Sequence, residues 1–143
     1  MATQTSVLQP YLFFEGRCEE AVEFYKKALG AEVVFMMRFK DSPDPNASQG
    51  VPPDKIMHTT LRIAGNDVMA SDGRCEHPMK FQGFALSLSV NTDAEADKYF
   101  NALTQGGQVI MPLAKTFWSP RFGMVTDKFG IMWMVSVLTG HEK

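Results

Sequence analysis

Two residues of the first half of the chain, His58 and Asp72, have the side chains from which an oriented general base is built. They lie on the two arms of a hairpin expected to turn at Gly65-Asn66. With a three-residue turn the imidazole and the carboxylate would face each other, whereas with a two-residue turn Asp72 would pair with Thr59 and point away from His58. The sequence does not determine which of the two turn lengths is present. A polar pair that only satisfies its own hydrogen bonds is the structural alternative to a catalytic base.

Alternation along two expected strands sorts further side chains into two faces. The strands expected over 56–63 and 83–90 each have an apolar side suited to contact a helix, formed by Met57, Leu61 and Ile63 and by Phe84, Leu86, Leu88 and Val90. The polar side chains of both strands share the opposite side; they are His58, Thr60, Arg62, Ser87 and Ser89. With Met132 and Met134 this side is too apolar for a plain solvent face, so we interpret it as the lining of a cup. A solvated outer face is the alternative.

Aromatic and methionine side chains could supply the apolar edge of such a cup. Methionine adapts its shape to varied ligands, so this edge could hold a planar or apolar small molecule. The residues assigned to it are Phe14, Phe117, Trp118, Phe122, Met132 and Met134. Trp118 lies in the loop-like segment 116–121, where an exposed ring is suited to stacking on a ligand. Arg121 beside it could pair with an anionic substrate or with Asp127.

The elements that must position these residues repeat once along the chain. A helical stripe of apolar side chains over 18–29 matches a second one over 92–105, at an offset of 75 residues. Each helix follows one expected strand and precedes three, and the strands are expected over 7–14, 32–39, 56–63, 67–72, 83–90, 108–111, 122–126 and 131–138. We therefore predict one α+β domain over 1–143, built from two βαβββ modules at about 7–75 and 83–138. They would form a cup-shaped, mostly antiparallel sheet with the helices on its outer face.

Composition narrows the classes of function. The chain has 143 residues, 14 Lys and Arg against 16 Asp and Glu, and a net charge of -2, so it has no basic excess for binding nucleic acid. The two cysteines, Cys18 and Cys75, do not make a disulfide framework. No apolar run approaches about 18 residues, and the start has no secretory signal pattern, so we expect no membrane partner and a cytoplasmic location.

Several short stretches between residues 8 and 138 form a combination typical of one protein superfamily. They are Pro10-Tyr11-Leu12-Phe13-Phe14, Glu19-Glu20-Ala21, Phe24-Tyr25, Ile63-Ala64-Gly65, Ser71-Asp72, Thr116-Phe117-Trp118 and the run from Phe122 to Gly130 that leads to Trp133. With these stretches the chain resembles the vicinal oxygen chelate superfamily, which includes glyoxalase I, extradiol dioxygenases and bleomycin-resistance proteins. Within it the chain looks like the PhnB-like branch, often labelled 3-demethylubiquinone 3-methyltransferase-like. The resemblance implies two modules around a cup-shaped site, often within a homodimer. Methyl transfer is not expected, because a Rossmann-type enzyme needs a glycine-rich turn and a parallel sheet.

The resemblance also allows a test for a divalent metal, which such proteins bind with His, Glu or Gln from four strands. The corresponding positions here are Pro10 (or Gln9), Ser71 (or Asp72), Ala85 and Met134. Proline, alanine and methionine are not ligands for a hard divalent ion. We therefore expect no metal and no other cofactor.

The sequence thus predicts a PhnB-like protein that binds a small organic molecule in the sheet cup without the superfamily's usual metal. The alternative is a metal-assisted lyase or isomerase of the glyoxalase or dioxygenase type, or an enzyme that uses His58 as its base, and the sequence does not decide whether the chain is an enzyme. Catalytic roles are assigned to His58 and Asp72. Ligand binding is assigned to Thr60, Arg62, Ser87, Phe117, Trp118, Phe122 and Met134.

Overall fold

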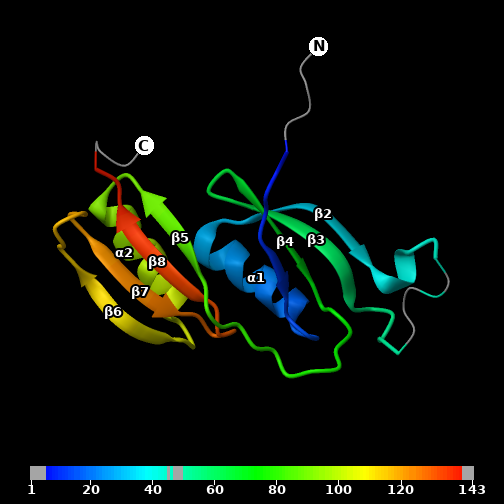
Figure 1. The fold of residues 1–143 in the computed structure, drawn as a ribbon. Helices are drawn as coiled ribbons and strands as arrows, with labels where there is room; N and C mark the ends of the chain where they lie inside the picture. The colour runs from blue at the N-terminus through cyan, green and yellow to red at the C-terminus, as the bar shows by residue number, and fades with distance from the viewer. Residues whose placement is uncertain (1–5, 45, 47–49, 140–143) are drawn as a thin grey trace, which may run out of the picture. The chain divides into compact units, whose positions relative to one another are not determined.

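The computed structural model describes residues 6–44, 46 and 50–139 (Figure 1). The chain divides into two compact units. Unit 1 comprises Met1–Lys26 and Gly30–Pro78, and unit 2 comprises Lys27–Leu29 and Met79–Lys143.

Unit 1 contains the first βαβββ module, except that the last residues of its helix, Lys27–Leu29, are grouped with unit 2, and a short 3-10 helix lies in the long connection after its second strand. Its elements are β1 (Tyr11–Phe13), α1 (Cys18–Leu29), β2 (Glu32–Arg38), η1 (Phe39–Asp41), β3 (Ile56–Ile63) and β4 (Asn66–Ser71). The four strands form one open sheet in the order β1-β4-β3-β2. The β1 strand runs parallel to β4, and the other neighbours are antiparallel.

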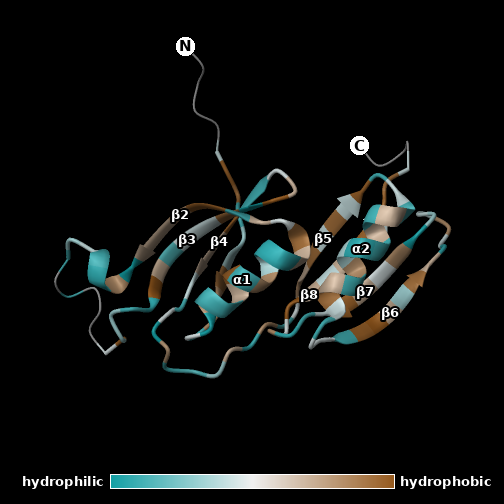
Figure 2. Cartoon of the chain, turned by 180° about the vertical axis from the view of Figure 1, so that it is seen from behind, coloured by the Kyte–Doolittle hydropathy of each residue, from teal (hydrophilic) through white to brown (hydrophobic). Residues whose placement is uncertain are grey.

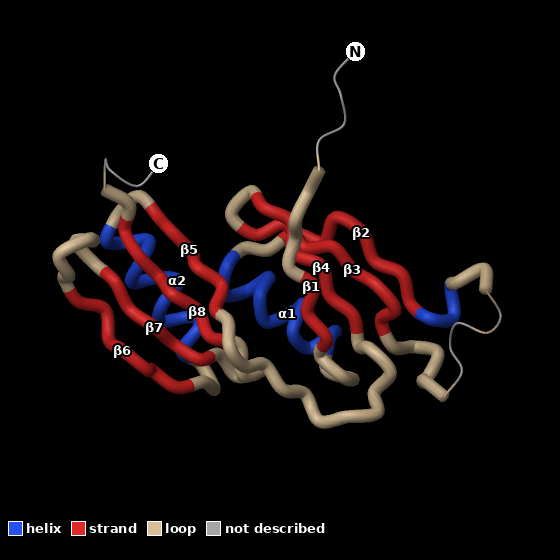
Figure 3. The backbone as a smooth tube through the Cα atoms, in the orientation of Figure 1, coloured by secondary structure: helices blue, strands red, loops and turns tan. Residues whose placement is uncertain are grey.

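Unit 2 repeats this plan. Its elements are β5 (Ala85–Val90), α2 (Asp93–Thr104), β6 (Gln108–Ala114), β7 (Phe122–Thr126) and β8 (Met132–Val137). The sheet order is β5-β8-β7-β6, again with one parallel pair, between β5 and β8. The α2 helix packs across its sheet (Figure 3). Both modules therefore have the predicted element order, and the α+β class is confirmed.

Each helix shows a predicted cap at one of its ends. Gly30 closes α1 in the left-handed conformation that glycine adopts without strain, at φ 67°, and its N–H donates to the carbonyl of Lys26. At the start of α2 the Thr92 hydroxyl accepts from the N–H of Glu95 at 3.1 Å, as the capping-box spacing predicts. Neither α1 nor α2, nor any other helix in the described ranges, has the length and apolar character of a membrane span.

Two expected strands differ from the observed strands by more than two residues at one end. The strand expected over 7–14 is reduced to Tyr11–Phe13, because Pro10 has no N–H to donate to a ladder. The strand expected over 108–111 continues to Ala114, and its register with β7 shifts twice. Proline is tolerated at such irregular edge positions, so Pro112 does not end β6.

The hairpin between β3 and β4 turns one residue earlier than predicted. Ile63 pairs with Asn66, so the turn residues are Ala64 and Gly65, and their φ angles are 51° and 81°. Positive φ at both central residues is the signature of a type I′ turn, whose twist matches that of the flanking strands. The register of β4 against β3 follows from this turn.

Candidate functional site

One side of each sheet is closed by buried apolar side chains. In unit 1 these include Leu12, Leu61, Val68 and Ala70, and Phe14 lies with them at 1% exposure. Phe14 contacts the ring of Tyr25 from α1, with ring centroids 6.3 Å apart. The prediction that Phe14 edges an open cup is therefore wrong, because strand parity turns it into the core.

The opposite side of the unit 1 sheet carries the predicted polar residues of β3. We call this surface face 1 and define it by the side chains that the register places there: Tyr11, Phe13, Glu32, Phe35, Met37, His58, Thr60, Arg62, Asp67, Met69 and Ser71. The rings of Tyr11, Phe13 and Phe35 are 37% to 50% exposed. Large apolar rings therefore surround a polar centre on an accessible surface.

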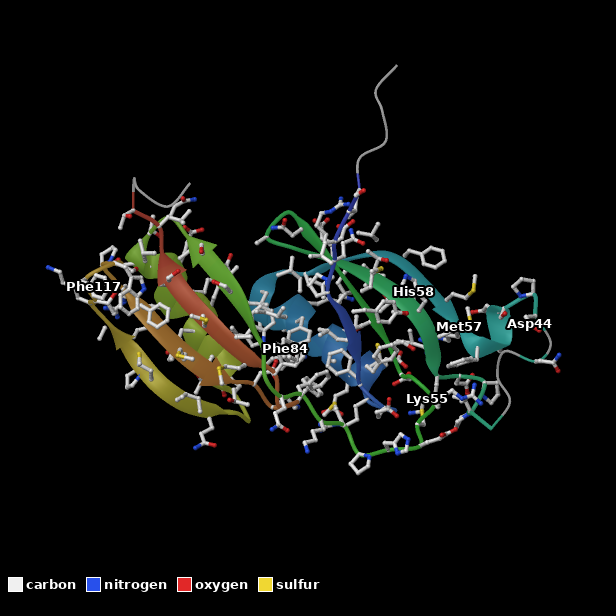
Figure 4. All side chains as sticks on the ribbon, in the orientation of Figure 1. Asp44, Lys55, Met57, His58, Phe84 and Phe117 are labelled. Atoms are coloured by element: carbon white, nitrogen blue, oxygen red, sulfur yellow. The ribbon has the colours of Figure 1, made fainter. Side chains whose placement is uncertain are left out.

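His58 is the centre of face 1 and is held at both ring nitrogens (Figure 4). Its Nδ1 lies 2.7 Å from the hydroxyl of Tyr11, and its Nε2 lies 3.2 Å from Oγ1 of Thr60. The rings of Tyr11 and Phe35 lie at 5.4 Å and 6.0 Å from the imidazole. Few contacts orient an imidazole as completely as hydrogen bonds at both nitrogens.

The Tyr11 hydroxyl can act as a donor to His58. Burial raises the pKa of the Tyr11 phenol above its ordinary value, so this group keeps its proton at neutral pH. A tautomer of His58 with its proton on Nε2 accepts from Tyr11 at Nδ1 and donates to Thr60. In that tautomer Tyr11, His58 and Thr60 form one directed chain of hydrogen bonds.

Asp72 does not belong to this chain. Its carboxylate is 1% exposed, and its two oxygens accept from the backbone N–H groups of Cys18 at 2.7 Å and of Ile56 at 2.6 Å. Extending the observed register by one pair places Ser71, not Asp72, opposite His58. Of the arrangements that the sequence left open, the one in which His58 faces Asp72 is therefore excluded. Asp72 instead joins the first residue of α1 to the first residue of β3.

Arg62 lies on face 1 as predicted, but acidic residues surround it. Its Nε donates to the carboxylate of Asp67 at 3.0 Å, and its partner in β2 is Glu32. The guanidinium charge is therefore balanced within the sheet. Face 1 consequently presents no net positive charge to a ligand.

The open side of the unit 2 sheet carries the other predicted residues. We call it face 2 and define it by the side chains that the register aligns there: Ala85, Ser87, Ser89, Gln108, Met111, Ala114, Phe122, Met124, Thr126, Met132, Met134 and Ser136. Ser87, Met134, Met124 and Met111 form one row across all four strands. The predicted residues Ser87 and Met134 are therefore neighbours.

The loop after β6 extends the aromatic part of face 2. Phe117 is 96% exposed and contacts Trp118, with centroids 4.7 Å apart. Trp118 lies 5.2 Å from Phe122, which is on this side of the sheet but only 5% exposed, so the prediction that Phe122 lines an open surface is wrong. The loop is braced by Ser119, which is 1% exposed and whose hydroxyl donates to the carbonyl of Val137 at 2.8 Å. Figure 4 shows Phe117 at the end of this loop.

Arg121 and Asp127 at the ends of β7 do not pair with each other. Arg121 contacts Asp97 of α2 at 2.6 Å. Asp127 is buried, and its carboxylate accepts from the N–H groups of Phe129 and Ile131 and from the indole of Trp133. Of the two partners expected for Arg121, an anionic substrate or Asp127, the second is excluded.

The residues carried over for a divalent metal do not form a suitable ligand set. Both oxygens of Asp72 accept from backbone donors, and Ala85 and Met134 offer no hard ligand. In the part of the chain that the structure describes, no group of three or more His, Cys, Asp or Glu could hold a metal ion.

Sequence reasoning missed four residues of these two faces. Tyr11 and Phe35 contact His58, and Met111 and Met124 complete the row on face 2. The alternation of Tyr11 and Phe13 with the buried Leu12 is a signal that could have identified Tyr11 as a residue of face 1. Phe35 and Met111 lie next to register shifts, where simple alternation does not identify the face.

Comparison with known proteins gives the family. The model of a family described as 3-demethylubiquinone-9 3-methyltransferase matches residues 6–136. The chain belongs to this family. Its curated relatives include Protein YjdN of Escherichia coli (strain K12), which is 37% identical over 139 residues that cover 92% of this chain and 95% of YjdN.

Solved structures support the same assignment. Protein PA1353 from Pseudomonas aeruginosa is 44% identical with a TM-score of 0.81, and the match covers 94% of this chain and 98% of that one. A PhnB protein from Bacillus cereus, described as a putative 3-demethylubiquinone-9 3-methyltransferase, is 29% identical with a TM-score of 0.77 over 92% and 99%. A glyoxalase-related enzyme from Fulvimarina pelagi shares the fold, at 18% identity and a TM-score of 0.62 over 94% and 88%. The predicted membership of the PhnB-like branch is thereby confirmed.

Proposed function

We propose that this PhnB-like protein binds a small organic molecule on face 1, with His58 as the hydrogen-bonding centre. The observation that carries the proposal is the doubly hydrogen-bonded imidazole among partly exposed rings. Tyr11 and Thr60 fix its orientation, and Phe35 and Phe13 offer apolar area around it. A few fixed polar groups within an apolar lining are typical of small-molecule sites.

The charged groups of face 1 disfavour an anionic ligand. Arg62 has Asp67 and Glu32 as neighbours, so an anion would meet two carboxylates beside the one guanidinium. A planar neutral molecule could instead lie against the rings and exchange hydrogen bonds with Thr60 and His58. Arg62 and Asp67 would then lie at the edge of the ligand rather than neutralise a charge on it.

Catalysis through His58 is the second candidate function. A general base needs a fixed orientation, which the hydrogen bonds to Tyr11 and Thr60 supply, and a lone pair for the substrate's proton. Because the Tyr11 hydroxyl lies at Nδ1, the substrate's proton would pass to the Tyr11 oxygen while Tyr11 gives its own proton to Nδ1. Isomerase or lyase chemistry by proton transfer is compatible with this arrangement. Metal assistance is not part of the proposal, because the carried-over positions lack hard ligands.

The family's name describes methyl transfer, and the residues do not support that activity. In Rossmann-type methyltransferases a glycine-rich turn connects a parallel strand to a helix. The two strand-to-helix connections here are Phe14-Glu15-Gly16-Arg17 and Asn91-Thr92, and each sheet has one parallel pair. We therefore propose binding without methyl transfer.

A ligand screen by NMR tests the proposal. Amide and histidine imidazole resonances would be followed while planar heteroaromatic fragments are added one at a time. We expect hits to shift the imidazole of His58 and the amides of β3, and to leave the imidazole of His77 unchanged, since His77 lies exposed in a loop. Hits that cluster elsewhere on the chain would reject face 1 as the site.

We further propose that the protein is a homodimer and resides in the cytoplasm. Figure 2 shows hydrophobic residues along the edge strands β2 and β6. Val34 on β2 and Ile110 on β6 are each 48% exposed, so a second copy could cover them. Cys18 and Cys75 are both free thiols, as in reducing compartments. Light scattering would give the mass in solution, and a dimer that persists in both Val34→Lys and Ile110→Lys would exclude these edges as the interface.

A further inference from the structure

We propose that the ligand of face 1 is an organic cation whose positive charge lies on a quaternary ammonium group. This inference rests on the proposed function, since it names the chemical class that the same site would take. Three features of face 1 carry it, namely exposed aromatic rings on both sides of the centre, an arginine that is already paired, and a carboxylate that is not.

Aromatic rings approach the centre of face 1 from two opposite edges of the sheet. Tyr11 and Phe13 extend from β1, and their stacked rings have centroids 4.9 Å apart. Phe35 extends from β2, which is the other edge strand of the same sheet. The imidazole of His58 lies 5.4 Å from the ring of Tyr11 and 6.0 Å from that of Phe35. One small group placed beside the imidazole would therefore contact rings from both edges.

These rings are accessible and suited to a cation. Tyr11, Phe13 and Phe35 are 37%, 50% and 47% exposed. The face of an aromatic ring carries negative electrostatic potential, so it attracts a cation within about 6 Å of its centroid. A quaternary ammonium has no N–H group, so it leaves no hydrogen bond unmade when its methyl groups lie against the rings. At equal shape, the rings therefore favour a cation over a neutral molecule.

The charged side chains of face 1 add to this preference. Glu32, Arg62 and Asp67 lie in one row, because Arg62 on β3 is paired with Glu32 on β2 and with Asp67 on β4. Arg62 donates to Asp67 at 3.0 Å, whereas the Glu32 carboxylate makes no ion pair with any residue in the described part of the chain. The row thus has one carboxylate more than its arginine balances. That carboxylate attracts a cation on the neighbouring part of the face.

The register gives the position that the cation would take. Phe35 is paired with Thr60, Thr60 with Met69, and Met69 with Tyr11, so one row joins two of the rings across the four strands. Thr60 and Met69 form the middle of this row, and Thr60 is two residues from Arg62 on the same side of β3. A quaternary ammonium above Thr60 and Met69 would have a ring at each end of the row. A polar group elsewhere on the ligand could exchange a hydrogen bond with the Thr60 hydroxyl.

The test compares choline with 3,3-dimethyl-1-butanol, in which carbon replaces the charged nitrogen and the shape is kept. Each compound is titrated into the protein, and the NMR shifts of the His58 imidazole and of the β3 amides give its dissociation constant. A cation–π contact at a partly exposed ring changes affinity about two- to fivefold, so contacts with two rings should make choline bind about tenfold more tightly. The anion of the same shape, 3,3-dimethylbutanoate, should bind most weakly of the three. Added salt should weaken choline and leave the alcohol unchanged.

Two variants at exposed positions test the two sources of attraction separately. Phe35→Leu removes a ring but keeps an apolar side chain, so it should weaken choline about threefold and change the alcohol by less than about twofold. Glu32→Gln removes the charge, so it should weaken choline about two- to threefold and reduce its salt dependence. Phe84→Leu and Glu76→Gln are the matched controls, because they make the same changes at an exposed ring and an exposed carboxylate that do not belong to face 1 (Figure 4). Both controls should leave the two affinities unchanged.

Three results would overturn the inference. One is equal affinity of choline and 3,3-dimethyl-1-butanol, or binding of neither. Another is a set of choline shifts that lies outside face 1. The third is an unchanged preference for choline in both Phe35→Leu and Glu32→Gln. The proposed function is tested independently, because neutral planar fragments that shift His58 and the β3 amides would support it even if choline does not bind.

Discussion

The substitution Asp72→Asn tests whether the buried carboxylate stabilises the fold through its hydrogen bonds. Each carboxylate oxygen accepts from one backbone N–H, at 2.7 Å from Cys18 and 2.6 Å from Ile56. An asparagine keeps one acceptor and turns its NH2 group toward the other N–H. One buried donor then loses its partner and the remaining bond loses its charge.

The magnitude follows from these two changes. A hydrogen bond to a charged group contributes about 1.5–3 kcal/mol, and an unsatisfied buried donor costs about 1–3 kcal/mol. We therefore expect Asp72→Asn to lower the free energy of unfolding by about 3 kcal/mol. For a chain of this size that corresponds to a fall in Tm of roughly 10 °C.

Urea unfolding followed by circular dichroism measures the effect, with Asp67→Asn as the matched control. Asp67 makes a partly exposed ion pair with Arg62, so its replacement should cost less than about 1 kcal/mol. Equal stability of Asp72→Asn and wild type would refute the structural role. A loss of ligand binding by folded Asp72→Asn, with stability unchanged, would restore the catalytic role assigned to it from the sequence.

Three further outcomes are expected. Tyr11→Phe should leave the fold intact but remove the donor at Nδ1 of His58. The 15N spectra of neutral His58 should then show a mixture of tautomers in place of the Nε2–H form. An unchanged spectrum would contradict the assignment of the proton to Nε2. Gly123→Ala should lower stability by about 2 kcal/mol, measured by thermal melting, because its Cβ would lie 2.8 Å from Cε1 of Phe100; wild-type stability would show that α2 can move away. Burial raises the pKa of the Cys18 thiol above its ordinary 9.0, so the unfolded chain loses this proton first and stability should fall as pH rises above about 9; the slope of stability against pH should flatten in Cys18→Ala.

The fold could be predicted because its signals are local and repeated. The Thr92–Glu95 spacing and Gly30 mark helix ends through contacts within one turn, and alternation along β3 assigns Leu61 to the core and His58 to the open side. The resemblance to the PhnB-like branch depended on stretches spread along both modules. All of these signals are independent of the exact pairing of strands.

The site was less predictable because it depends on register. A shift of one residue in the turn after β3 decides whether His58 faces Asp72, and the composition of Ala64-Gly65-Asn66 allowed more than one turn. Tyr11 reaches His58 from β1, 47 residues away in sequence, and no local pattern announces that contact. Phe35 lies beside a register shift, which breaks the alternation used to sort faces.

The dissociation constant of the tightest-binding fragment, compared between wild type and His58→Gln, tests the proposed function most directly. His77→Gln is the control, because it makes the same substitution at an exposed histidine of the same unit. Loss of the imidazole should weaken binding at least about tenfold, which corresponds to one hydrogen bond of about 1.4 kcal/mol, while His77→Gln should leave it unchanged. Equal affinities of all three proteins would contradict the assignment of His58 as the centre of the site.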